Sequence, residues 1–105
     1  MAIPILTEDR FEAEAAGSTL PVLLDFYASW CGPCQAIAPT LEALAEKHSD
    51  YYRFFKVDVD AERSLAKRFD IMSVPTLVLL KGGREINRLS GARSAAEILH
   101  MLEEA

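Results

Sequence analysis

The only two cysteines of the chain, Cys31 and Cys34, lie in the sequence Trp-Cys-Gly-Pro-Cys. An apolar run typical of a strand precedes them, and apolar residues at helical spacing follow. A thiol at the start of a helix meets the positive end of the helix dipole and several free backbone N–H groups. Both favour the thiolate, which is the reactive form of cysteine. The pattern therefore predicts thiol-disulfide exchange.

The two cysteines have different predicted roles. Cys31 comes first, at the exposed tip of the predicted helix, and is the expected nucleophile. Cys34 lies on the same helical face, so it can attack the mixed disulfide that Cys31 forms with a substrate. That second step is fast because it is intramolecular. Gly32 and Pro33 keep the loop tight, and proline is well tolerated at the start of a helix.

The cysteine pair also fits two alternatives at this point: a pair of core cysteines, and one half of a zinc site. A Cys₂His₂ zinc site needs two histidines at a characteristic spacing, which His48 and His100 do not supply. We expect no metal and no bound cofactor. Both histidines lie toward the C-terminal regions of predicted helices, where a protonated side chain interacts favourably with the helix dipole.

An acidic residue, Asp25, interrupts the apolar run Leu20–Ala28 that precedes the cysteines. A carboxylate inside a buried strand is unfavourable unless it is paired or protonated, so we expect a raised pKa for Asp25. The alternative is an acid at a solvent-exposed end of the strand. The apolar residues that precede it favour the buried position.

The composition is that of one folded domain over residues 1–105, since half of the residues are hydrophobic. A net charge of −5 without a basic cluster argues against nucleic-acid binding. No apolar run is long enough to span a bilayer, and the segment Met1–Asp9 does not have the pattern of a signal peptide. Two cysteines are too few for a disulfide-stapled secreted scaffold. We therefore expect a cytoplasmic monomer without a membrane association.

The elements that position these residues follow from periodicity and turn signals. Their order, β-α-β-α-β-α-β-β-α, predicts an α/β fold with a central mixed five-stranded sheet flanked by four helices. Pro4 places the first strand at a sheet edge. Gly82 and Gly83 predict a hairpin, and Ser94 with Glu97 predicts a capping box. The predicted strands are Ile3–Leu6, Pro21–Ala28, Tyr52–Val59, Pro75–Leu80 and Glu85–Ser90. The predicted helices are one that follows the N-cap Thr7 and ends near Ala16, residues 34–47 and 62–69, and a last one after Ser94.

The stretch from Asp25 to Cys34, Asp-Phe-Tyr-Ala-Ser-Trp-Cys-Gly-Pro-Cys, resembles the active-site sequence of the thioredoxin family. Two positions depart from the family pattern: Gln35 stands where members often carry Lys, and Tyr27 where many carry Trp. These departures bear on the redox tuning and on the choice of partner, and the chemistry is unaffected. The resemblance covers essentially the whole chain and also includes Pro39, Lys56-Val-Asp58, Val74-Pro-Thr76, Lys81-Gly-Gly83 and Gly91-Ala92.

The resemblance implies the thioredoxin fold and a protein-disulfide reductase with no bound cofactor, which a thioredoxin reductase reduces and which acts on disulfide-containing client proteins. It places Asp25 beneath Cys34, where the carboxylate accepts and returns the proton of that thiol. It makes Lys56 the partner of Asp25, although Lys56 alone fits a solvated strand lysine equally well. It also implies a cis peptide bond before Pro75, although cis bonds are uncommon even before proline.

A surface for client proteins is expected around the thiols, where the Val74 backbone pairs with an extended client peptide. Taken singly, its residues fit ordinary core or loop positions equally well. Together they make an apolar surface, which we call the docking face. It consists of Trp30, Gly32, Pro33, Met72, Val74, Pro75, Gly91 and Ala92.

Two other functions remain open on the sequence. An oxidant or isomerase of secreted proteins needs a destabilised disulfide and an oxidising compartment. The Gly-Pro between the cysteines and the absence of a signal-peptide pattern count against it. A binding module would use the fold without the thiols, and the cysteine pair with its buried acid counts against that function.

Overall fold

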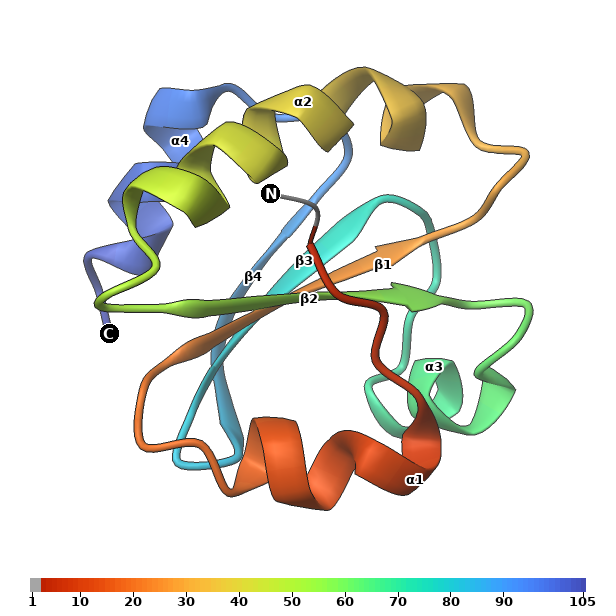
Figure 1. The fold of residues 1–105 in the computed structure, drawn as a ribbon. Coiled ribbons are helices and arrows are strands. Elements are labelled where there is room, and N and C mark those ends of the chain that lie inside the picture. The colour runs from red at the N-terminus through yellow and green to blue at the C-terminus, as the bar shows by residue number, and fades with distance from the viewer. Residues whose placement is uncertain (1–2) are drawn as a thin grey trace.

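Strand β1, Val22–Tyr27, lies at the centre of the sheet in the computed structural model (Figure 1). Its first five residues are buried, as its nearly continuous apolar run predicts. It pairs in parallel with β2, Arg53–Asp58, and antiparallel with β3, Thr76–Lys81. Strand β3 pairs antiparallel with β4, Arg84–Ser90, so the strand order is β2-β1-β3-β4.

The predicted first strand, Ile3–Leu6, is not a strand of this sheet, so the sheet within the described residues has four strands and the predicted five is wrong. Ile5 forms a single parallel bridge with Lys56. The Lys56 N–H donates to the Pro4 carbonyl oxygen and the Leu6 N–H donates to the Lys56 carbonyl oxygen, both at 2.9 Å. Pro4 has no N–H to donate, which limits pairing to these two bonds. The segment does lie along the outer edge of β2, where a proline is tolerated.

The structure describes residues 3–105. Met1 and Ala2, which belong to the predicted domain and to the segment expected to carry no signal peptide, lie outside the described residues. The Cα radius of gyration is 12.2 Å, close to the ~13 Å typical of one domain of this length. Among residues 3–105, no helix is both long enough and apolar enough to cross a membrane.

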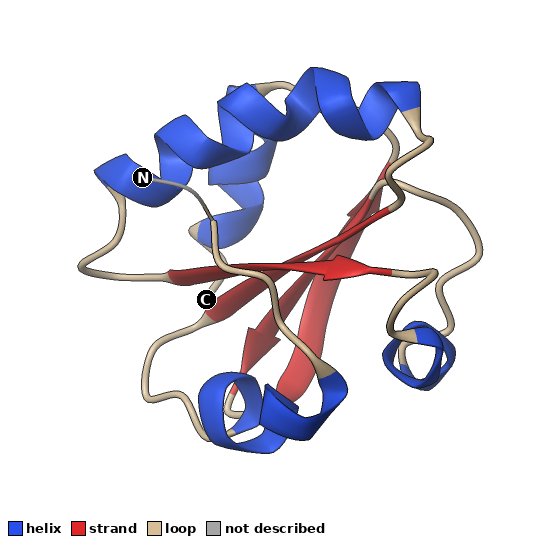
Figure 2. Cartoon of the chain, turned by 45° about the vertical axis from the view of Figure 1, so that its right-hand side comes forward, coloured by secondary structure: helices blue, strands red, loops and turns tan. Residues whose placement is uncertain are grey.

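Helices cover both faces of the sheet, which confirms the predicted α/β architecture (Figure 2). On one face lie α2, Gly32–Lys47, and α4, Ala95–Leu102. On the other face lie α1, Glu8–Phe11, its continuation η1, Glu12–Ala16, and α3, Arg63–Arg68. Counting α1 and η1 as one helix, the described residues form the four predicted helices.

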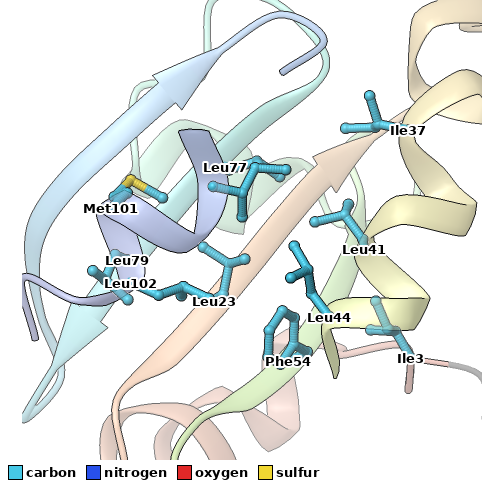
Figure 3. Close-up of a cluster of buried hydrophobic side chains, with 11 residues drawn as sticks. Ile3, Leu23, Ile37, Leu41, Leu44, Phe54, Leu77, Leu79, Met101 and Leu102 are labelled. Carbon is cyan, nitrogen blue, oxygen red and sulfur yellow. The ribbon is translucent and has the colours of Figure 1, made fainter. Parts of the chain in front are cut away.

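Each face of the sheet has its own core. Between the sheet and the helices α2 and α4, Leu23 and Leu77 of the strands pack with Leu41 of α2 and Met101 of α4 (Figure 3). Successive side chains of a strand point to opposite faces, so Asp25, two residues after Leu23, points to the face that α2 covers. The opposite face is filled by Leu6, Phe11, Ala15, Val22, Leu24, Phe26, Phe55, Val57, Leu65, Val78 and Leu80.

The turn and cap signals are confirmed. Gly82 and Gly83 join β3 to β4 with φ angles of +61° and +78°, which glycine adopts without strain. The Glu97 N–H donates to the Ser94 hydroxyl oxygen, and the Ser94 N–H donates to a Glu97 carboxylate oxygen, both at 3.1 Å. This is the predicted capping box at the start of α4.

Candidate active site

The two cysteines form a disulfide at the N-terminus of α2. The helix begins at Gly32, two residues earlier than predicted, so Cys31 is its N-cap and Cys34 lies in its first turn. Pro33, at the second helical position, takes a place where a missing N–H costs nothing. The Cα atoms of the two cysteines are 5.3 Å apart, within the range that a disulfide bridges.

The helix terminus provides the electrostatic environment that the sequence predicts for Cys31. The Cys34 N–H donates to Cys31 Sγ at 3.2 Å, so the sulfur caps the helix. When the disulfide is reduced, this N–H and the positive end of the helix dipole favour a thiolate at Cys31. Cys31 Sγ also lies 3.7 Å from the carbonyl oxygen of Val74, on the loop that precedes β3.

The predicted exposure of Cys31 is wrong for the disulfide form. Cys31 and Cys34 are 4% and 5% exposed, because Ala28 and the partly buried Tyr27 and Val74 pack around them. The two cysteines are therefore almost equally buried, and they differ in the groups that surround them. Cys31 is the residue whose sulfur lies near the Val74 carbonyl, whereas Cys34 lines the cavity that contains Asp25.

Asp25 is buried on β1, with 8% of its surface exposed, and its Oδ1 has no hydrogen-bond partner among residues 3–105. Together with Cys34 it lines a cavity of about 180 Å³ under the start of α2. Burial raises the pKa of Asp25 from 3.8 to about 6, and the positive charge of Lys56 opposes part of this rise. The predicted burial and raised pKa of Asp25 are confirmed.

Lys56 lies on β2 directly opposite Asp25 in the register of the parallel pair. Its Nζ is 5.6 Å from the centroid of the Tyr27 ring, an arrangement that favours a cation over an aromatic face. Lys56, Tyr27 and Asp25 line the same cavity. Sequence reasoning noted Tyr27 only as a departure from the family, although its place two residues after Asp25 puts it on the same face of β1.

The peptide bond between Val74 and Pro75 is cis, as the resemblance implies. The Gly91 N–H donates to the Pro75 carbonyl oxygen at 2.8 Å, so the segment of Gly91 and Ala92 lies beside the loop that contacts Cys31. Gly91 has a φ of +83°, in the region that favours glycine. Pro75 is itself buried, whereas the other predicted docking-face residues are exposed or half-buried.

A groove of about 200 Å³ is lined in part by Val74, whose carbonyl oxygen lies 3.7 Å from Cys31 Sγ. Trp30 and Met72 are 71% and 87% exposed at its rim. The Trp30 indole N–H donates to an Asp60 carboxylate oxygen at 2.9 Å, which orients the ring. The groove is lined by Trp30, Val59, Ile71, Met72, Ser73 and Val74.

Four residues of this region were missed by sequence reasoning: Val59, Asp60, Ile71 and Ser73. The signal for Asp60 was available, because parallel strands end at the same edge of a sheet. Asp60 follows the carboxyl end of β2, next to the carboxyl end of β1 that leads to Trp30. The other predicted members of the docking face, Gly32, Pro33 and Ala92, are exposed.

Gln35, at a position where the family often has Lys, hydrogen-bonds to the neighbouring loop. Its side-chain amide donates to the Ser29 carbonyl oxygen at 3.0 Å, and both residues line the Asp25 cavity. Within residues 3–105, no group of three or more His, Cys, Asp and Glu side chains is arranged to hold a metal ion. His48 follows α2 and His100 lies in the last turn of α4, as predicted.

This arrangement defines a thiol-disulfide oxidoreductase, whose redox group is the Cys31–Cys34 pair itself. Comparison with known proteins gives the family. The family model described as Thioredoxin matches residues 2–104. The chain therefore belongs to the thioredoxin family, whose members act by dithiol-disulfide exchange.

Individual relatives agree with this assignment. The chain is 42% identical over 102 residues to the thioredoxin of Mycolicibacterium smegmatis, and the match covers 95% of this chain and 91% of that protein. It is 46% identical over 86 residues to the thioredoxin of Alicyclobacillus acidocaldarius, covering 82% and 81% of the two chains. It is also 38% identical over 99 residues to the bifunctional thioredoxin reductase/thioredoxin of Mycobacterium leprae, covering 94% of this chain and 22% of that protein.

Proposed function

We propose that the protein is a reductant of protein disulfides in which Cys31 is the nucleophile, Cys34 is the resolving thiol and Asp25 accepts and returns the proton of Cys34. The observation that carries this assignment is the position of the two sulfurs. Cys31 Sγ caps the helix, which favours its thiolate, while Cys34 shares a cavity with a carboxyl group.

The proposed reaction has two exchange steps. The Cys31 thiolate attacks one sulfur of a client disulfide, which forms a mixed disulfide and releases the other client sulfur as a thiolate. Cys34 then transfers its proton to the Asp25 carboxylate and attacks Cys31 Sγ. The Cys31–Cys34 disulfide forms, the second client thiolate leaves, and two electrons have passed to the client. Because the pKa of Asp25 is about 6, the carboxylate is mostly ionised at neutral pH and able to take the proton.

Lys56 has a proposed electrostatic role in the second step. Its charge lies across the sheet from Asp25 and lowers the pKa of that carboxyl group, against the larger effect of burial. It therefore keeps more of Asp25 in the ionised form at neutral pH than burial alone would allow.

The docking face is the proposed binding surface for client proteins. Its exposed apolar groups, chiefly Trp30 and Met72, lie beside the groove next to the disulfide. An extended client segment would pair with the Val74 backbone, whose carbonyl oxygen lies 3.7 Å from Cys31 Sγ. Such pairing would bring the client disulfide to Cys31 Sγ, the sulfur proposed to attack it.

A thioredoxin reductase would return the pair to the dithiol, and the Mycobacterium leprae relative carries both activities in its name. We propose that residues 1–105 form one domain that acts as a monomer in the cytoplasm, on several disulfide-containing client proteins.

The first test is the reduction potential of the Cys31–Cys34 pair, measured in dithiol/disulfide buffers from the fluorescence of Trp30, the only tryptophan. A potential well below that of the glutathione pool is expected for a reductant. A potential near or above that of the pool would instead indicate an oxidant or isomerase. The residue roles are tested by Cys31→Ser, which should abolish turnover, and Cys34→Ser, which should accumulate mixed disulfides with clients.

A further inference from the structure

Met72 has the highest exposure among the large hydrophobic side chains of the described residues, at 87%. A methionine in this position adds little to folding, because its thioether and methyl group contact mainly solvent. Met101 provides the contrast within the same chain. It is 2% exposed and belongs to the core between the sheet and α4 (Figure 3).

The place of Met72 links it to the redox pair. It lies on the loop between α3 and β3 and lines the groove of about 200 Å³ together with Trp30 and Val74. Val74, two residues further on, has its carbonyl oxygen 3.7 Å from Cys31 Sγ. On the proposed docking face, a client whose disulfide reaches Cys31 would pass over the Met72 side chain, whose flexible thioether adapts to apolar partners of different shapes.

We propose that Met72 is an oxidation-sensitive site on the docking face, where a hydroperoxide converts its thioether to the sulfoxide and thereby weakens client binding while the Cys31–Cys34 disulfide stays unchanged. The inference rests on the proposed docking face. It assigns to the protein a second redox-responsive group, one that acts on recognition and takes no part in electron transfer.

The reaction needs only the peroxide and an accessible sulfur. The Met72 sulfur attacks the terminal oxygen of the hydroperoxide, so that a sulfur–oxygen bond forms and the oxygen–oxygen bond breaks. The sulfur loses two electrons, the peroxide is reduced, and its proton moves to the departing oxygen to give an alcohol or water. The Met72 side chain is open to solvent, whereas that of Met101 is enclosed.

The consequence for binding follows from the change in polarity. A sulfoxide is polar, so burying it against an apolar client group loses the favourable transfer of the thioether and leaves a strong acceptor without a partner. We expect the second-order rate constant for reduction of a protein disulfide to fall about tenfold, the effect of losing roughly one well-buried apolar contact. Small dithiols do not need the groove, so the rate at which dithiothreitol reduces the protein should stay the same.

The test treats the disulfide form with hydrogen peroxide, because its cysteines then have no free thiols. Peptide mass spectrometry follows addition of one oxygen at Met72 and at Met101. After the peroxide has been removed and the Cys31–Cys34 disulfide has been reduced, the rate constant toward insulin is measured in a single turnover from Trp30 fluorescence.

Met72→Leu, which keeps an apolar side chain of similar volume without sulfur, is the matched control. Methionine sulfoxide reductase, with dithiothreitol as the electron donor, is used to reverse the modification.

We expect Met72 to be oxidised well before Met101. Peroxide treatment should lower the rate constant toward insulin approximately tenfold, leave the rate with dithiothreitol unchanged, and be reversed by methionine sulfoxide reductase. Treated Met72→Leu should react with insulin at the same rate as untreated Met72→Leu. Equal oxidation of Met72 and Met101 would overturn the inference, as would a Met72 sulfoxide that reduces insulin at the untreated rate, or an equal loss in Met72→Leu. An equal loss of rate with insulin and with dithiothreitol would also overturn it, and would leave the proposed function intact. If the untreated protein fails to reduce insulin, the proposed function is wrong and the inference falls with it.

Discussion

Replacing Asp25 by asparagine is expected to make the disulfide form more stable at neutral pH. Asp25 is buried, its Oδ1 has no hydrogen-bond partner within the described part of the chain, and burial raises its pKa from 3.8 to about 6. At pH 7.5 the folded protein therefore contains a largely ionised carboxylate buried under α2, and the Lys56 charge offsets only part of the cost of burying it. Asparagine has nearly the same shape and no charge, so Asp25→Asn removes the cost of burying that charge.

The magnitude follows from the pKa. One pKa unit corresponds to about 1.36 kcal/mol, so the rise from 3.8 to about 6 corresponds to ~3 kcal/mol when Asp25 is fully ionised. Because the folded-state pKa lies above the unfolded one, the folded protein holds the proton more tightly. The contribution of Asp25 to stability therefore falls as the pH rises from about 4 to about 6, and it stays at the lower level above that.

The variant should be more stable than the wild type by up to ~3 kcal/mol at pH 7.5, and the two should be nearly equal at pH 3.5. For a domain of this size the difference raises Tm by about 10 to 20 °C. The assay is urea unfolding of the disulfide form across this pH range. Asp50→Asn, at an exposed position, is the control and should change little. A gain of the same size at pH 3.5 and pH 7.5, or no gain at either, would refute the reasoning. The variant should also release clients more slowly from the mixed disulfide.

Three further predictions concern the surroundings of the site. Lys56→Met should raise the pKa of Asp25 above about 6, because the lysine charge lowers it; carboxyl-carbon NMR across a pH titration measures this. Gly91→Ala should lower the free energy of unfolding by ~1 to 2 kcal/mol, because a φ of +83° strains a residue with a Cβ; urea unfolding measures this. Ser94→Ala should cost ~1 kcal/mol and lower Tm by about 4 to 8 °C, through loss of the capping box; calorimetry measures this.

Each of these predictions has an outcome that contradicts it. An unchanged pKa of Asp25 in Lys56→Met, matching an exposed control such as Lys47→Met, would show that the lysine charge does not reach the carboxyl group. A Gly91→Ala variant as stable as the wild type would mean that the loop relaxes to another φ. If Ser94→Ala and Ser94→Thr unfold at the same temperature, the hydroxyl is not acting as the helix cap.

Local signals in the sequence predict most of the fold. The long apolar run predicts the central strand, the glycine pair predicts the hairpin, and Ser94 with Glu97 predicts the last helix start. The fifth strand is the exception, because the apolar pattern of Ile3–Leu6 does not show how few backbone bonds remain beside Pro4. Whether a segment forms a strand depends on the backbone hydrogen bonds that it makes with a neighbouring strand, and these are known only from the folded chain.

The candidate site likewise contains residues that the sequence predicts and residues that it does not. The cysteine pair and the buried acid are predicted because unusual residue types interrupt an apolar pattern. The burial of Cys31 is missed, since it depends on Val74, which is 43 residues distant in the chain. Val59 and Ile71 are missed for the same reason: as ordinary apolar residues at element ends, they become groove lining only when the two loops meet.

The hydrogen bond from the Cys34 N–H to Cys31 Sγ has one further consequence. The acceptor of this bond is a disulfide sulfur in one redox state and a thiol or thiolate in the other, and the donor is a backbone amide. Backbone amide resonances are sensitive to the charge of the acceptor, since a bond to an ionised sulfur is shorter and stronger. The Cys34 amide is therefore an internal spectroscopic reporter. Its proton resonance should register both the oxidation state of the pair and the ionisation of Cys31, without any added label.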